Sequence, residues 1–509
     1  MSKDDQDIQK SKCDLYPKTE VDITDIKRKS VSGGIATMVS QAFTIAIQLT
    51  STVVLARLLS PDDYGVMAMV MAVTGFAGLF RDLGLSSAAI QKKDLTDAQQ
   101  SNLFWLNVAM GAALTTIVAV GSPVVAWFYG KPELTSVTLA LSLSFLIGSF
   151  GTQPGARLVR EMQFARQGVA SITGSVVCLI VSVSLALNEY SYWSLVWGGL
   201  VGSTVTTILL FMLAPFRPGL PSRGTGMRDM LKFGANVTAF SFVNYFHRNL
   251  DNILIGKFWG PAALGVYSRA YQLLMFPISA IRGPLNAVAF PAMSRLQSQP
   301  VDFRNYYRKI TQLLAISSMP LTAFLFIASD PLIELLLGKT WSQVSTTFAL
   351  LAITGFIQPV AGLRGTVLLS CGHGKRYLLW GVFNAVCVSL GFLIGVRWRG
   401  TGIATSYAIV NYAILYPSLI LAFKDTPLSP KDFFMPILVP AAASIVAALF
   451  VYCLGRMGKL DAMHPVIHLV ILSGVFATIY LLTSLVLPGG RHALVQVYRL
   501  LFPIQRRVS

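Results

Sequence analysis

The sequence predicts an all-α integral membrane protein with about fourteen transmembrane helices, arranged as two pseudo-symmetric lobes of six helices and a C-terminal pair. Two observations on composition predict this class: 54% of the 509 residues are hydrophobic and only 13% are charged, and the mean hydropathy is +0.60. These values are far from those of soluble proteins. A third observation is that apolar runs of about 20 residues, the length of helix that crosses a bilayer, recur along the chain.

The apolar runs are bounded by charged or turn residues, which set the expected helix limits. Residues 1–32 are polar and are predicted to form a disordered tail, and the first apolar run exceeds a signal-peptide core of about 7 to 15 residues. The first lobe, 33–213, is expected to contain helices at 33–56, 66–90, 102–128, 134–155, 167–187 and 192–213. A linker at 214–230 leads to the second lobe, 231–422, with helices at 231–256, 266–293, 310–329, 342–364, 376–396 and 401–422. The final pair, within 433–487, is expected at 433–454 and 464–487, followed by a tail at 488–509.

The basic residues predict the orientation of these helices. With the N-terminus on the cytoplasmic side, most of the 41 Lys and Arg residues fall in the tails and loops of that side, as the positive-inside rule requires. Both termini and the linker are therefore expected in the cytoplasm. The formal net charge of +18 is spread over many short loops, so it indicates topology and attraction to anionic lipid headgroups rather than nucleic-acid binding.

The five cysteines indicate neither a disulfide framework nor a metal centre. Their number is odd, and they lie in apolar runs or on the predicted cytoplasmic side. Cys371 and His373 are close together in the string CGHGK, but a structural zinc site needs four ligands, so a tight turn is expected there. We expect no metal, no cofactor and no nucleic-acid partner.

An internal repeat predicts the two lobes. The string ARLLSPDDYGV at 56–66 aligns with GKFWGPAALGV at 256–266, and the matched pairs are Arg57 with Lys257, Pro61 with Pro261, Gly65 with Gly265, and Val66 with Val266. A second match, QPGARL from 153 and QPVAGL from 358, ends the fourth helix of each half. Because six helices separate the copies, the halves share one orientation, and such repeats place substrate sites where the halves meet. Chance recurrence of Pro and Gly at helix turns is the alternative.

A polar stripe interrupts the apolar run at 231–256. Asn244, Arg248, Asp251 and Asn252 follow the i, i+4, i+7, i+8 spacing of one helix face. A central Arg or Asp costs about 2.5 to 3.5 kcal/mol in a bilayer, so this face should contact protein or water. Two interpretations stay open: Arg248 and Asp251 form a structural ion pair, or they line a solvated cavity in which Asp251 couples a proton or sodium ion.

Further arginines lie inside predicted helices: Arg81, Arg269, Arg282 and Arg364. Counting about 1.5 Å per residue places Arg269 toward the periplasmic side with Arg248, and Arg81 and Arg282 toward the cytoplasmic side. Arg81 and Arg282 occupy equivalent positions on the second helix of each lobe. Guanidinium groups at two depths indicate a transported anion that passes from one level to the other. Phosphate is a suitable anion, since arginine binds it through paired hydrogen bonds.

Two of these positions have another interpretation. Arg81 and its neighbour Asp82 fit a contact between helices, or a cytoplasmic gate, at least as well as a substrate contact. Asp82 is also a candidate for ion coupling. Arg364 lies so near its helix end that its side chain is expected to reach the membrane interface.

Four strings resemble one transporter family: VVLARLLSPDDYGVMAM, FRDLGLSSAAIQ, RNLDNILIGKFWGPAALGVYSRAYQL and FPAMSRL. They closely resemble the polysaccharide transporter family, the Wzx-type lipid-linked oligosaccharide flippases of the multidrug/oligosaccharidyl-lipid/polysaccharide (MOP) superfamily, and most of all its colanic acid and succinoglycan exporters. The resemblance runs from about residue 33 to about residue 423, and the last two helices match only in number.

The resemblance implies a MATE-like fold and a function. Two lobes would surround a cavity that alternates between the two sides of the bacterial inner membrane, and would move undecaprenyl-pyrophosphate-linked repeat units outward for exopolysaccharide, capsule or O-antigen. Arg248 would hold the pyrophosphate, with Arg269, Arg81 and Arg282 as further candidates. The implied partners are the lipid-linked oligosaccharide, membrane lipids, and the polysaccharide polymerase and export machinery.

Two other functions are weighed against this one. A multidrug exporter of the same superfamily would share the fold but would more typically carry acidic cavity residues, whereas predicted intramembrane arginines outnumber acids here. A glycan polymerase or ligase would be expected to carry a long extracytoplasmic loop. No Ser, His or Cys constellation and no phosphate-binding Gly loop is found, so the sequence predicts a transporter and not an enzyme.

Overall fold

The computed structural model describes residues 23–92, 95–224, 226–455, 464–488 and 490–491, apart from the side chains of 23–32, 35, 228–229 and 231–248. Every regular element in these ranges is a helix, which confirms the predicted all-α class. The tail predicted as disordered at 1–32 is wrong over residues 23–32, which extend the first membrane helix, and its remaining residues lie outside the described ones. Most of the tail predicted at 488–509 also lies outside the described residues.

The first lobe contains the predicted helices in a more divided form. Its elements are α2 (Ile23–Leu58), α3 (Pro61–Asp82), α4 (Leu85–Gln91), α5 (Asp97–Val120), α6 (Ser122–Tyr129), α7 (Glu133–Arg160), α8 (Phe164–Leu187) and α9 (Trp193–Leu213). The helix predicted at 66–90 divides into α3 and α4 because Leu83 and Gly84 adopt left-handed conformations, with φ of 47° and 66°. The helix predicted at 102–128 divides at Gly121, just before Pro123 begins the next turn.

The second lobe and the C-terminal pair follow. Their elements are α10 (Arg228–Arg295), α11 (Pro300–Ile327), α12 (Ser329–Leu337), η1 (Lys339–Trp341), α13 (Ser342–Ala361), α14 (Leu363–Ser370), α15 (Gly374–Gly395), η2 (Val396–Trp398), α16 (Arg399–Ala413), α17 (Leu415–Phe423), α18 (Pro430–Gly455) and α19 (Pro465–Val486). α10 consists of two helices, because Gly260 breaks it with φ 79° and ψ −176°. This conformation is open to glycine and strained for other residues.

Twelve helical stretches among the described residues are long and apolar enough to cross a membrane. One of them, Gly374–Ala413, contains both α15 and α16. The exact number of fourteen passes stays a prediction.

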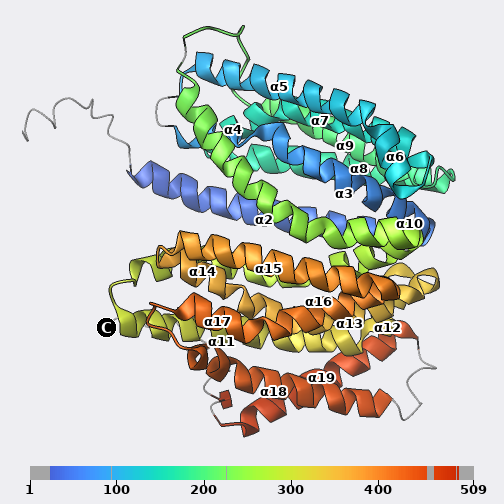
Figure 1. Ribbon diagram of the computed structural model, residues 1–509, viewed down its shortest axis with the longest axis vertical. Coiled ribbons are helices and arrows are strands. Elements are labelled where there is room, and N and C mark those ends of the chain that lie inside the picture. Colours follow the sequence, from blue (N-terminus) through green and yellow to red (C-terminus); the bar gives the residue numbers. More distant parts are fainter. Residues whose placement is uncertain (1–22, 93–94, 225, 456–463, 489, 492–509) are drawn as a thin grey trace, which may run out of the picture.

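The membrane helices run roughly side by side, with the first lobe above the second in Figure 1. α6 and α12 lie at one end of the bundle, which we name the Pro61 end, and α4 and α14 lie at the other, the Gln91 end. The first half of α10 starts at the Gln91 end of the first lobe, where Met230 packs against Leu85 and Ala88. It then crosses to the Pro61 end beside α3 (Figure 1).

The lobes meet at the Pro61 end through the two copies of the internal repeat. A Cβ atom on Gly65 would lie 1.8 Å from the carbonyl oxygen of Pro261, and a Cβ atom on Gly265 would lie 1.9 Å from that of Pro61. The two backbones therefore touch at equivalent places, and only glycine permits the approach. The chance explanation of the repeat does not account for this reciprocal contact.

Two hydrogen bonds between the lobes flank this contact, and they too are equivalent under the repeat. Arg57 Nη2 donates to the carbonyl oxygen of Leu335 on α12, at 2.7 Å. Its counterpart Lys257 donates through Nζ to the carbonyl oxygen of Phe128 on α6. Each lobe therefore binds the short helix that follows the third membrane helix of the other lobe.

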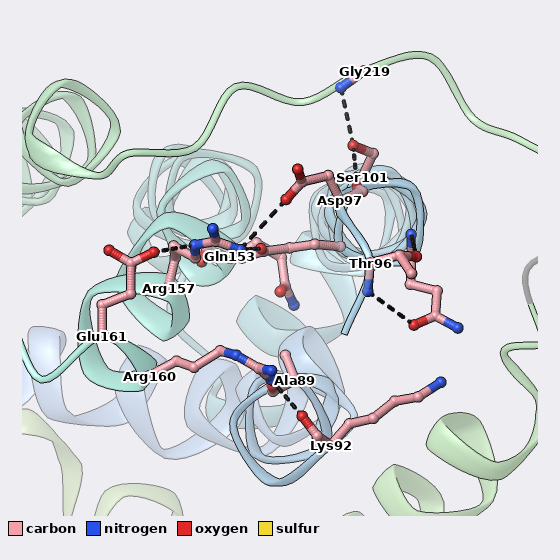
Figure 2. Close-up of polar contacts among 12 residues, drawn as sticks. Ala89, Lys92, Thr96, Asp97, Ser101, Gln153, Arg157, Arg160, Glu161 and Gly219 are labelled. Atoms are coloured by element: carbon pink, nitrogen blue, oxygen red, sulfur yellow. Dashed lines mark hydrogen bonds and ion pairs between the residues drawn. The ribbon is translucent and has the colours of Figure 1, made fainter. Parts of the chain in front are cut away.

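At the Gln91 end, a polar network holds the first lobe together (Figure 2). Arg157 on α7 donates through Nε to Glu161, at 2.5 Å, and through Nη1 to Gln100 on α5, at 2.9 Å. Arg160 donates to the carbonyl oxygens of Ala89 in α4 and of Lys92 just after it, at 2.7 and 2.5 Å. These basic residues, which contribute to the predicted topology, also fasten α4 and α5 to α7.

The segment between the lobes is fixed to the first lobe. The hydroxyl of Ser101 on α5 accepts from the backbone N–H of Gly219, at 3.0 Å (Figure 2). Asn102 makes two hydrogen bonds to the backbone of Ser222, at 2.7 and 2.9 Å. The part of the predicted linker around Gly219 and Ser222 is therefore docked along α5.

We expect Gly65→Ala or Gly265→Ala to loosen the Pro61 end. Overpacking by a methyl group costs about 1 to 3 kcal/mol, so the open population at this end should rise about fivefold or more. The readout is the rate at which a thiol reagent labels Leu264→Cys, which is fully buried beside Gly265, in a background without the native cysteines.

Gly474→Ala is the matched control, because an added Cβ there meets no atom within 4 Å. Unchanged labelling in both glycine variants, with each protein still monodisperse in detergent, would contradict the proposed role of the contact.

Candidate functional site

A polar cavity of about 220 Å³ lies inside the second lobe, between α10, α13, α14, α15 and α16. Three charged residues line it: Asp251, Arg282 and Arg364. Polar side chains line the wall between them: Tyr271, Gln358, Asn384, Tyr407 and Asn411. Since a charge in hydrocarbon is costly, a cavity with three of them is the strongest candidate site in the described part of the chain.

Asp251 is held in place by two donors. Its side chain is 5% exposed, Oδ2 accepts from the hydroxyl of Tyr267 at 2.8 Å, and Oδ1 accepts from the backbone N–H of Asn252 at 2.8 Å. Among the side chains that the structure describes, no Lys or Arg forms an ion pair with this carboxyl. The side chain of Arg248 lies outside the described residues, so the predicted Arg248–Asp251 pair stays a prediction.

Arg282 lies against a glycine of the neighbouring helix. A Cβ atom on Gly362, between α13 and α14, would be 2.7 Å from Nη2 of Arg282. Because Gly362 has no side chain, the guanidinium of Arg282 fits in the space beside it, at the cavity wall. Arg282 therefore borders the same cavity as Asp251.

The guanidinium of Arg364 points into the second lobe, which contradicts the expectation, drawn from its position in the sequence, of a side chain directed to the membrane interface. Its Nε donates to the carbonyl oxygen of Ala361 at 2.7 Å, and its Nη1 donates to the hydroxyl of Ser418 on α17. Its guanidinium lies 5.2 Å from the ring centre of Trp380 on α15, a cation–π arrangement that holds it at the cavity. The aromatic ring and the buried hydroxyl compensate the charge inside the lobe.

Arg81 and Asp82 lie in the first lobe, apart from this cavity. A Cβ atom on Gly148 would be 2.5 Å from Nη1 of Arg81, which repeats the arrangement of Arg282 against Gly362. Asp82 accepts from the backbone N–H and the hydroxyl of Ser86, at 3.0 and 2.8 Å. Asp82 thus caps the start of α4, a structural role that its place beside Arg81 did not indicate.

Arg269 lies between the lobes near the Pro61 end. Its guanidinium is 4.1 Å from the ring centre of Tyr64 on α3, and Tyr64 packs edge-on against Trp341 with ring centres 5.4 Å apart. Its Nε is buried without a hydrogen-bond partner in the part of the chain that the structure describes. This residue therefore belongs to the contact between the lobes and not to the cavity.

The structure thus brings Asp251 and Arg282 together and adds Arg364, whereas Arg81, Asp82 and Arg269 lie elsewhere. Two guanidinium groups and one carboxyl give the cavity a positive balance. Guanidinium groups bind phosphate through paired, charge-assisted hydrogen bonds. Gln358, on the wall, lies in the repeated string QPVAGL; the other polar wall residues carried no signal in the sequence beyond lying in apolar runs.

Comparison with known proteins gives a family, relatives and a similar fold. The family described as "Polysaccharide biosynthesis protein" matches residues 54–346. The lipopolysaccharide biosynthesis protein WzxC of Escherichia coli K12 is 24% identical over 445 residues, covering 85% of this chain and 89% of its own length. The teichuronic acid biosynthesis protein TuaB of Bacillus subtilis 168 is 28% identical over 436 residues, covering 83% and 89%.

Among solved structures, the inward closed conformation of the lipid II flippase MurJ superposes with a TM-score of 0.72 at 14% sequence identity, over 88% of this chain and 98% of that one. This likeness confirms the predicted fold. The membrane-spanning helices and the relatives together make this chain a multi-pass protein of the inner membrane.

We expect Tyr267→Phe to destabilise the protein by about 1 to 3 kcal/mol, because it removes a donor from the buried carboxyl of Asp251. Thermal unfolding in detergent measures the change as a lower midpoint. Tyr412→Phe is the control, since it also removes a tyrosine hydroxyl, which here donates to the neutral backbone carbonyl of Ile353 at an exposed position. Equal shifts in the two variants would argue against a special role of the Asp251 contact.

Proposed function

Because the chain belongs to the family of polysaccharide biosynthesis proteins, we propose that it is a flippase for lipid-linked oligosaccharides. It moves undecaprenyl-pyrophosphate-linked repeat units from the cytoplasmic to the periplasmic leaflet for exopolysaccharide, capsule or O-antigen synthesis. The relatives named as lipopolysaccharide and teichuronic acid biosynthesis proteins, and the likeness to a lipid II flippase fold, support this substrate class.

The cavity of the second lobe is the observation that carries the proposal. A pyrophosphate that leaves water needs fixed positive groups to replace its hydration, and Arg282 and Arg364 offer two guanidinium groups at one cavity. An organic cation would instead need a surplus of carboxyl groups. The positive balance therefore favours the lipid-linked anion over the substrates of a multidrug exporter.

Transport proceeds by alternating access. The Gln91 end faces the cytoplasm, as do both termini, and the Pro61 end faces the periplasm. The substrate enters between the lobes at the Gln91 end while its lipid tail stays in hydrocarbon, and rocking of the lobes then closes that end and opens the Pro61 end. The reciprocal contact of Gly65 and Gly265 keeps the outer end closed in the conformation observed. No covalent bond is made or broken.

The membrane potential supplies the driving force. Moving one net negative charge outward across an interior-negative membrane gains about 2.3 kcal/mol per 100 mV. Asp251 is the group that would couple a proton or sodium ion, because it lies at the cavity and its described contacts are neutral donors. A polymerase and export machinery would receive the flipped units.

Cells that lack the gene provide the direct test of function. Mass spectrometry of lipid-linked oligosaccharides, combined with leaflet accessibility, should find complete repeat units trapped on the cytoplasmic leaflet. An unchanged lipid pool would reject the flippase and favour drug export.

We expect Arg282→Ala and Arg364→Ala each to slow flipping in proteoliposomes by about 10- to 100-fold, because a hydrogen bond to a charged group contributes about 1.5 to 3 kcal/mol. Lysine at either position should restore part of the rate, since it keeps the charge but loses the paired geometry. The control is Arg304→Ala, because this exposed arginine also makes charged contacts, to the carbonyl oxygen of Pro427 and to Asp432 at 3.7 Å, but lies outside the cavity. Full activity in both cavity variants would exclude them from substrate binding.

Arg248→Ala should abolish export while the protein accumulates normally, if its guanidinium holds the pyrophosphate. Export is measured by surface polysaccharide, and accumulation by immunoblot of membranes. A loss of protein instead of activity would identify Arg248 as half of a structural ion pair with Asp251.

A further inference from the structure

A second cavity, of about 410 Å³, lies in the first lobe between α2, α8 and α9. On α2 its wall is formed by Thr44, Gln48 and Ser51, which share one helix face at the spacing i, i+4, i+7. The offset of the repeat, which pairs Pro61 with Pro261, pairs these three residues with Asn244, Arg248 and Asp251. The stripe of the first lobe is thus the uncharged copy of the charged stripe on α10.

The two cavities also use equivalent helices. α2, α8 and α9 are the first, fifth and sixth membrane helices of the first lobe, and the first half of α10, α15 and α16 hold those places in the second lobe. Both sets line a cavity, and the charged one is lined in addition by the second half of α10 and by α13 and α14. The first-lobe cavity is therefore the counterpart of one part of the charged cavity, the part formed by the first, fifth and sixth helices, with different side chains.

The chemistry of the first-lobe cavity is that of neutral hydrogen-bond acceptors. None of the described residues that line it is charged. Four of its hydroxyl groups donate their proton to a carbonyl oxygen of their own helix, at 2.8 to 2.9 Å: Thr44, Ser175, Ser203 and Thr206. Their lone pairs stay available to accept, and the amide of Gln48 adds both a donor and an acceptor.

We propose that the first-lobe cavity binds uncharged sugar residues of the substrate, while the cavity of the second lobe binds its phosphate groups. This inference rests on the proposed function. Sugar hydroxyl groups are donors that match a wall of acceptors, and a neutral saccharide needs no compensating charge. Binding at both cavities makes the sugars and the pyrophosphate contact different lobes, so the relative position of the lobes depends on both parts of the substrate.

The test compares two lipids in proteoliposomes: a fluorescent polyprenyl pyrophosphate that carries a single hexose, and one that carries the complete repeat unit from the producing cells. The variant combines Gln48→Leu with Thr206→Val. We expect it to flip the complete unit about tenfold more slowly, which is the effect of losing one or two neutral hydrogen bonds. Its rate for the single-hexose lipid should stay within about twofold of the wild type.

Thr116→Val is the matched control, because this exposed threonine also donates to its own helix, to Ala112, but lies on α5 outside the cavity. A second variant, Gly199→Val, fills the cavity, since an added Cβ there meets no atom within 4 Å. It should likewise slow the flipping of the complete unit and leave the rate for the single-hexose lipid nearly unchanged. Equal slowing of both lipids, or no slowing by either variant, would overturn the inference. A wild-type protein that flips neither lipid would reject the proposed function itself.

Discussion

The close contact between the two copies of the repeat is the constraint on which the arrangement of the lobes depends. Gly65 receives the backbone of Pro261, and Gly265 receives that of Pro61, so neither contact can form without bringing the other near. The hydrogen bonds of Arg57 and Lys257 to the opposite lobe stand on either side of it. We expect two such coupled contacts to form and break together, which favours two discrete states of the Pro61 end, closed or open, over a graded series.

A charged side chain can lie within a lobe only where there is room for it between the helices and where nearby groups compensate its charge. Arg81 and Arg282 each lie against a glycine, whose missing side chain leaves room for a guanidinium between helices. Arg269 and Arg364 instead lie over aromatic rings, whose π electrons attract a cation. Asp251 is compensated by two neutral donors. A cation near such a carboxyl gains more there than in water, because the low dielectric strengthens the attraction.

Hydropathy was sufficient to predict the apolar part of each membrane helix, but not polar extensions such as residues 23–32 of α2 and 300–309 of α11. The repeat predicted two lobes of one orientation, but not that the repeated strings themselves touch. The breaks at Gly84 and Gly121 were missed because a single glycine hardly changes the hydropathy of a long run. The place of Arg364 was missed for a different reason: the distance to a helix end gives the depth of a residue but not the direction of its side chain. Direction depends on the rotation of each helix, and nearly uniform apolar sequences carry little information about rotation. The same limit explains why Asp251 and Arg282 were predicted as cavity residues, but not the wall of Asn384, Tyr407 and Asn411 that joins them.

The two lobes have equivalent helices, but the side chains that line their cavities differ. This difference affects how ligand binding depends on the relative position of the lobes. If both cavities were charged, each lobe could hold an anion alone, and binding would not depend on how the lobes are placed. The first-lobe cavity carries hydroxyl groups, and the second-lobe cavity carries charged groups. A ligand with a neutral part and an anionic part therefore gains its full binding energy only when the distance between the two cavities matches the distance between its two parts. A ligand shifts a conformational equilibrium only by the difference between its affinities for the two states. If opening of the contact of Gly65 and Gly265 changes the separation of the two cavities, dividing the contacts between the lobes is an arrangement that makes this difference large.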